Sequence, residues 1–165
     1  MSANTITPSS PTGKPLTAFF TLHNEALSNL VKSSCDTVQS LDYTCTRNRD
    51  EAGTPYGPPQ FTELTFSLRA SITNYKSTFY KLLDSHEAGN FTFLFNADFT
   101  PKTRKLDKYE GGFVVQGYII NIDEEYETSS KDGTFEQLLL HITLLVNAIT
   151  YLGNDESVKT LDILK

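Results

Sequence analysis

The sequence predicts a single, mainly β domain that carries one short helix. Phe and Tyr make up 12% of the 165 residues, and aromatic side chains suit the half-buried surface of a sheet. Several short runs alternate apolar and polar residues, which indicates strands with one buried face, whereas one run has an apolar stripe at helical spacing. A chain of this length can bury its own core. We expect a flexible arm rich in Ser, Thr and Pro over residues 1–15 and one domain over residues 16–165.

The first strand is predicted at residues 16–23 (LTAFFTLH), where apolar residues dominate. Residues 24–34 are ambiguous. Leu27, Leu30 and Val31 fit one face of a helix, but the serines around them weaken that interpretation.

The next two strands flank a loop. Residues 35–46 read as a strand with a bulge near Ser40, and two-residue alternation is clear from Leu41 onward. Residues 47–60 contain three prolines and two glycines, which disfavour regular structure, so we predict a long loop there. Such a long loop inside a compact domain is usually functional or bound to a partner. Residues 61–70 alternate cleanly and predict a strand with one buried face.

A helix is predicted after this strand. Asn74 is a candidate N-cap, and the helix should end near His86, before the stop signal of Gly89. Its apolar stripe consists of Tyr75, Phe79, Leu82 and Leu83.

Further strands are expected at residues 90–96 and 113–126, with a bend or bulge at Gly117. A polar connection separates them, and a turn follows the second. Residues 135–152 fit a helical stripe and a strand about equally well on period and propensity alone. A short element is expected within residues 155–165.

Composition argues against several classes of function. The formal net charge is −6 and the pI is near 5.0, whereas a nucleic-acid-binding protein normally needs a basic face. The N-terminal residues lack the basic and apolar regions of a signal peptide or membrane anchor. We therefore expect synthesis and folding in the cytoplasm, with Cys35 and Cys45 as reduced thiols. The cysteine spacing does not suggest a zinc site.

Motifs for catalysis are missing from the sequence. It contains no phosphate-binding glycine motif, no GxSxG and no HExxH. We interpret His141 as a satisfied core or interface residue. Asp123, Glu124, Glu125 and Glu127 could hold a cation or supply paired carboxylates, but a solvated strand end is the simpler interpretation. We expect no catalytic residue, no cofactor and no metal.

Two charged segments suggest a contact between copies of the chain. Lys102, Arg104 and Lys105 lie in a basic run, and Glu124 and Glu125 lie in the acidic one. In a ring of identical subunits, the basic segment of one copy could face the acidic segment of the next, and complementary charge would set the register of the contact.

The order and spacing of these elements resemble the haemolysin-coregulated protein family (Hcp, or TssD), the tube protein of type VI secretion, in its Bacteroidota-like branch. The similarity covers residues 16–152, and Thr54 stands where an Arg is common. The matching segments are Leu41–Arg49, Asp50 with Gly53-Thr54-Pro55, Tyr56–Gln60, Phe61–Ala70, Phe79–Leu83, Asn90–Phe95, Tyr118–Ile122 with Glu125-Tyr126, and Leu138–Tyr151.

The resemblance implies a small β-barrel or a pair of packed antiparallel sheets, with one short α-helix on its flank. The resemblance also implies that residues 135–152 form a strand. It also implies hexameric rings that stack into a tube, with a lumen that can carry small effectors. The ring-stacking loop would comprise Asp50, Gly53, Thr54, Pro55, Tyr56, Gly57 and Pro58.

The implied partners are other copies of the chain, the sheath, spike and baseplate proteins of the machine, and secreted effectors. Nucleic acid and membrane insertion are not expected. The protein would assemble in the cytoplasm and leave through the machine without a signal peptide.

Two alternatives remain open at this point. The chain could be a tail-tube subunit of another contractile injection system, in which identical subunits also assemble into rings. It could instead be a monomeric β-barrel whose aromatic strands line a pocket for a small apolar ligand. An enzyme ranks third.

Overall fold

A computed structural model describes residues 16–22, 27–70, 73, 75–128, 133–153 and 158–162 of the chain. The described residues are mainly β, with one short α-helix. The strands are β1 (Ala18–Leu22), β2 (Asp36–Arg49), β3 (Pro55–Leu68), β4 (Gly89–Phe95), β5 (Asp98–Phe99), β6 (Leu106–Lys108), β7 (Gly112–Thr128), β8 (Phe135–Leu152) and β9 (Val158–Asp162). The helices are α1 (Lys76–Asp84) and the 3₁₀ turns η1 (Leu27–Asn29) and η2 (Lys32–Ser34).

The main sheet closes on itself. Its strand order is β3-β2-β1-β4-β7-β8-β9, every paired register is antiparallel, and β3 also pairs with β8. One edge of β8 pairs with β7. The other edge pairs first with β3, from Leu140 to Leu145, and then with β9, from Ala148 to Leu152. The circuit from β3 round to β8 is therefore the small closed sheet that the Hcp resemblance implies.

Alternating side chains from these strands fill the interior. Six buried phenylalanines lie among its aliphatic residues, and the ring of Phe20 packs against Phe66, Phe91 and Phe93 at centroid distances of 4.9, 6.3 and 5.3 Å. These rings are fully buried, and together they remove a large apolar area from water. The predicted alternation of β3 is confirmed, since Leu64, Phe66 and Leu68 are all buried.

Helix α1 supplies one more ring to this core. Phe79 is fully buried, and its ring lies 5.7 Å from Phe20. Tyr75, just before the helix, shares a hydrogen bond of 3.0 Å with the Thr21 hydroxyl. The predicted helix is confirmed, but its N-cap is Tyr75 and not Asn74, which lies outside the described residues.

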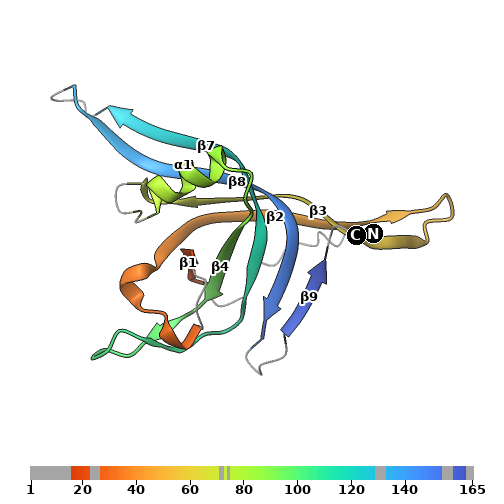
Figure 1. Cartoon of the computed structure of the whole chain (residues 1–165), viewed down its shortest axis with the longest axis horizontal. Helices are drawn as coiled ribbons and strands as arrows, with labels where there is room; N and C mark the ends of the chain where they lie inside the picture. Colours follow the sequence, from red (N-terminus) through yellow and green to blue (C-terminus); the bar gives the residue numbers. More distant parts are fainter. Residues whose placement is uncertain are drawn as a thin grey trace, which may run out of the picture.

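Two long hairpins reach beyond the closed sheet (Figure 1). One is formed by β2 and β3 and extends to the right of the view, and the other is the far half of β7 and β8 at the upper left. A small two-stranded sheet of β5 and β6 lies on η1 and η2, where Leu30, Leu94 and Ala97 form a second apolar cluster. Residues 97–112, predicted as an irregular connection, contain this small sheet.

Two local register shifts occur where the sequence predicts them. The β2–β3 register shifts between Val38 and Ser40, and the β7–β8 register shifts between Gln116 and Gly117. Both confirm a predicted bulge. The ambiguous residues 24–34 contain two 3₁₀ turns and no α-helix in their described part. The predicted flexible arm over residues 1–15 and most of the turn over residues 128–133 lie outside the described residues.

Candidate functional site

The hairpin of β2 and β3 is the first candidate site, and we call its outer part, residues 43–61, the hairpin arm. A tight turn closes it. The Thr54 carbonyl accepts a 3.0 Å hydrogen bond from the Asp50 N–H, and the Asp50 carboxylate accepts one of 2.8 Å from the Thr54 N–H. Gly53 has φ +83, a left-handed conformation that favours glycine. The turn therefore has a defined geometry.

The hairpin arm exposes its backbone edges. β2 pairs with β1 only through Asp36 and Thr37, and β3 pairs with β8 only from Glu63 to Leu68. Beyond these points, the described strands leave the outer edges of the arm unpaired. Open edges of this kind are templates for pairing with another chain. Every side chain from Asp42 to Pro58 is exposed as well.

The prediction of a loop over residues 47–60 is wrong. β2 continues to Arg49 and β3 begins at Pro55, which leaves only the turn between them. A register shift between Thr46 and Asn48 accommodates Gly57, Pro58 and Pro59. Proline lacks an N–H donor, but on an unpaired edge no ladder bond is lost. Of the predicted ring-stacking residues, Asp50, Gly53 and Thr54 form the turn, whereas Pro55, Tyr56, Gly57 and Pro58 belong to β3.

The predicted basic residues lie on and beside the β5–β6 hairpin. Lys102, Arg104 and Lys105 are exposed, and the described part of the chain gives none of them an ion pair. The structure adds Lys32 from η2, whose N–H donates a 2.9 Å hydrogen bond to the Arg104 carbonyl. The sequence could not show this, because the two residues are far apart in the chain.

The predicted acidic residues lie near the end of β7. Glu124 Oε1 is 2.5 Å from Lys76 Nζ on α1, and Glu124 Oε2 accepts a 2.7 Å hydrogen bond from the Tyr126 hydroxyl. These bonds lower the pKa of Glu124, with the bond from Lys76 as the larger cause. Glu125 lies 3.1 Å from His141 Nε2, so His141 is a partly exposed residue with a carboxylate partner.

The structure separates the two charged segments. The small hairpin ends at Lys108, shortly before β7 begins at Gly112, and the acidic residues lie at the other end of β7. At about 3.3 Å per residue, a strand of 17 residues has a contour length of roughly 56 Å. Figure 1 shows the two segments at the lower and upper left of the molecule. One copy therefore cannot join its own basic and acidic segments.

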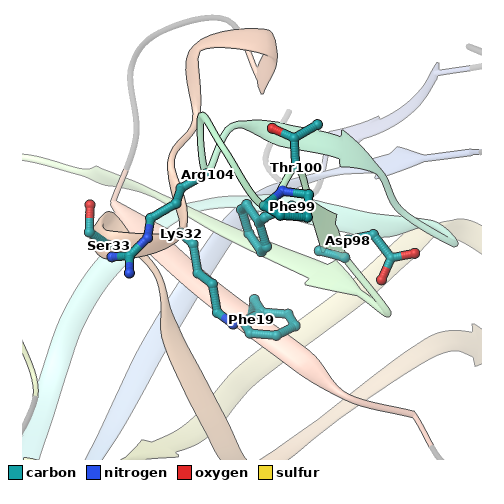
Figure 2. Close-up of a pocket in the computed structure, with 9 residues that line it drawn as sticks. Phe19, Lys32, Ser33, Asp98, Phe99, Thr100 and Arg104 are labelled. Atoms are coloured by element: carbon teal, nitrogen blue, oxygen red, sulfur yellow. The ribbon is translucent and has the colours of Figure 1, made fainter.

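A pocket of about 510 Å³ lies between η2 and the β5–β6 hairpin (Figure 2). Phe19 and Phe99 form its apolar part, with ring centroids 5.7 Å apart in an edge-to-face arrangement. Lys32 and Arg104 also line it. In Figure 2, Lys32 extends toward Phe19 and Arg104 toward Ser33, while the Asp98 carboxylate points away from them.

Within the described ranges, no three His, Cys, Asp or Glu side chains lie together in a way that could hold a metal ion. No helix among the described residues is both long and apolar enough to cross a membrane. Cys35 and Cys45 are free thiols.

The comparisons with known proteins concern the fold. No family model and no curated protein matches the sequence. Solved structures do match: a crystal structure of an Hcp protein is 12% identical and has a TM-score of 0.61, with coverage of 92% of this chain and 99% of that one. Hcp1 from Flavobacterium johnsoniae is 11% identical with a TM-score of 0.55, covering 89% and 98%. The secreted protein Hcp3 from Pseudomonas aeruginosa is 8% identical with a TM-score of 0.52, covering 93% and 100%.

The chain has the Hcp fold. The resemblance predicted from the sequence is therefore confirmed by structures that span nearly the whole domain. The Hcp fold also agrees with the assignment of residues 135–152 to a strand, which is β8. Identities near 10% establish shared architecture and leave the Bacteroidota-like branch a prediction.

Proposed function

We propose that this chain is a structural subunit of the inner tube of a type VI secretion machine. Six copies form a ring, rings stack into a tube, and the lumen carries effectors. The Hcp fold together with the projecting hairpin arm is the observation that supports this proposal. The chain acts through shape and contacts, and catalysis has no part in the proposed role.

The hairpin arm is proposed to make the contact between rings. It reaches beyond the closed sheet and presents two unpaired backbone edges and an exposed Tyr56. A neighbouring strand could add to either edge through main-chain hydrogen bonds. Side-by-side contacts with a closing rotation give a ring, and a second contact along the axis extends it.

The proposed partners follow from this role. They are other copies of the chain, the sheath, spike and baseplate proteins, and secreted effectors, without nucleic acid or membrane insertion. Assembly takes place in the cytoplasm, and the machine exports the protein without a signal peptide. We also propose that Lys102, Arg104 and Lys105 contact Glu124 and Glu125 of a neighbouring copy.

The alternatives differ in their support. A tail tube of another contractile injection system is also built from stacked rings of identical subunits, so the fold alone does not separate it from the proposed role. A monomeric barrel for a small apolar ligand has no support from the interior. Its aromatic side chains pack on one another there, and the described pockets lie at the surface with polar residues in their walls.

Light scattering and negative-stain microscopy of the full chain test this proposal. It predicts six-fold rings with about six times the mass of the 18.4 kDa chain. A monomer at every concentration up to several hundred micromolar would rule the proposal out.

A further inference from the structure

The strands β2, β3, β8 and β7 lie side by side in that order, and one face of this sheet is left open by the core and by helix α1. On the other face, Phe66 lies opposite Ile142 and Ile142 opposite Ile122, and all three pack in the core. Helix α1 lies on that side too, since its Lys76 binds Glu124, two residues beyond Ile122. Alternate residues therefore point away from both. We call these outward side chains, within residues 40–42, 63–67, 118–123 and 141–145, the open face.

Two rows of mainly polar side chains cross the open face from strand to strand. In the first row, Thr65 lies opposite Asp42 on one side and Thr143 on the other, and Thr143 lies opposite Asn121. The hydroxyls of Thr65 and Thr143 are 3.3 Å apart and share a hydrogen bond. The second row consists of Ser40, Ser67, His141 and Asp123. These hydroxyls and acids suit a surface that stays in contact with water.

The charge of the open face is negative. Asp42, Glu63 and Asp123 are exposed, and none of them has an ion pair among the described residues. The basic side chain of this face, His141, is paired with Glu125. The four segments of the open face contain no Lys and no Arg, although the chain has 14 of them. The field of these acids therefore attracts positive charge from another molecule.

The spacing of the acids indicates the size of the occupant. Asp42 on β2 and Asp123 on β7 are three strand spacings apart, or about 14 Å across the sheet. They are too far apart to share one metal ion, but an extended segment of about four residues spans them. Leu145, which is 44% exposed, lies in register between Glu63 and Tyr118. The apolar stems of Lys and Arg can cover such a residue while their charged ends reach carboxylates.

We propose that the open face binds basic, extended segments of the exported cargo proteins. Lys and Arg side chains of the cargo pair with Asp42, Glu63 and Asp123, and their stems lie over Leu145. This inference rests on the proposed tube function, in which the open face is turned to the lumen, and it adds that the tube selects cargo by positive charge. Because exposed ion pairs are individually weak, the cargo is held reversibly and can leave the tube.

Neutralising the three acids tests the inference. The variant with Asp42→Asn, Glu63→Gln and Asp123→Asn keeps the size of each side chain. Its affinity for a fluorescein-labelled peptide of alternating Lys and Ala, measured by fluorescence anisotropy, should be lower than that of the wild type by about 10-fold or more. Wild-type binding should weaken between about 20 and about 200 mM NaCl, because salt screens exposed charges. A peptide of alternating Glu and Ala should not bind.

A matched variant controls for net charge. Asp84→Asn, Glu87→Gln and Asp107→Asn remove three exposed acids that lie outside the open face. Since both variants have the same net charge, a difference between them reports on the open face. The control should bind the basic peptide nearly as tightly as the wild type. Circular dichroism should show that both variants are folded, and negative-stain microscopy should show the wild-type assembly for both.

Peptide binding and ring formation are separate measurements, so the two proposals can fail separately. Equal binding of the basic peptide by both variants would overturn the inference and leave the ring proposal standing. The same conclusion would follow if the wild type did not bind the basic peptide, or bound the acidic peptide as tightly. A wild type that binds the basic peptide through the three acids but stays a monomer would support the binding face and overturn the ring.

Discussion

Lys76 places its ammonium nitrogen 2.5 Å from a carboxylate oxygen of Glu124, which ties helix α1 to the outer half of β7. The two residues belong to elements that are separated in sequence by β4, β5 and β6. The bond holds the helix against the hairpin of β7 and β8. Glu124 therefore supports the fold of its own chain.

This ion pair should make stability depend on pH in the acid range. The pKa of Glu124 lies below its ordinary value of 4.5 in the folded chain, so the stabilisation is present above about pH 4.5 and is lost as the pH falls through the lowered pKa. Since the pair is partly exposed, it contributes no more than about 1 kcal/mol. Thermal unfolding of the wild type and Glu124→Gln at several pH values checks this. The two melting temperatures should differ at pH 7 and converge toward pH 3, and a constant difference would contradict the assignment.

Helix α1 is anchored in the core by Phe79. The substitution Phe79→Ala removes a fully buried ring and should lower the free energy of unfolding by about 3–5 kcal/mol. Ser77→Ala, on the exposed side of the same helix, should have little effect. Urea unfolding of both variants measures the difference. Equal stabilities would mean that the helix does not belong to the core.

Gly117 allows β7 to approach β8 closely. A Cβ at this position would lie 2.4 Å from the Leu145 carbonyl oxygen, so Gly117→Ala forces the two strands apart. We expect a loss of about 1–3 kcal/mol in the free energy of unfolding. The exposed neighbour Gln116 provides the comparison, because Gln116→Ala should change stability very little. A Gly117→Ala protein as stable as the wild type would show that β7 and β8 are not paired in this register.

The two thiols should differ in reactivity. Burial is the main cause that raises the pKa of Cys35 from 9.0 to about 11, so its thiolate population at pH 8 is about 100-fold lower than that of an unperturbed thiol. Cys45 is exposed on the hairpin arm. Alkylation with iodoacetamide, followed by mass spectrometry, should label Cys45 first in the native protein and both residues at similar rates in urea. Preferential labelling of Cys35 in the native protein would contradict the structure.

The sequence predicted those strands in which the order of apolar and polar residues reflects which side chains are buried. β3 alternates because the closed sheet buries one side of it, whereas residues 91–94 of β4 are buried on both faces and are mostly apolar. Gly117 indicated its bulge for a local steric reason. β8 was ambiguous, because its apolar residues satisfy both periods. The family resemblance, and not the pattern, favoured a strand there.

Other features lie beyond what local sequence can show. The prolines of residues 55–59 indicated a loop, but the hairpin arm tolerates them. Its outer edge makes no backbone hydrogen bonds to a further strand, so the missing N–H of proline removes none. The approach of Lys32 to Arg104 and that of Lys76 to Glu124 arise only when distant segments pack together. Both were therefore missing from the predicted site.

The role of the hairpin arm in stacking is tested most directly by shortening it. Because Thr46 pairs with Gln60, residues 47–59 can be replaced by Asn-Gly, which forms a two-residue hairpin turn in the same register. A control variant carries Ser77→Ala on the exposed side of helix α1, away from the arm, and should stack like the wild type. Negative-stain microscopy then counts isolated rings and stacked rings for the wild type and both variants. We predict that the shortened protein still forms six-fold rings but stacks poorly, whereas stacking as long as that of the wild type would show that the arm does not join one ring to the next.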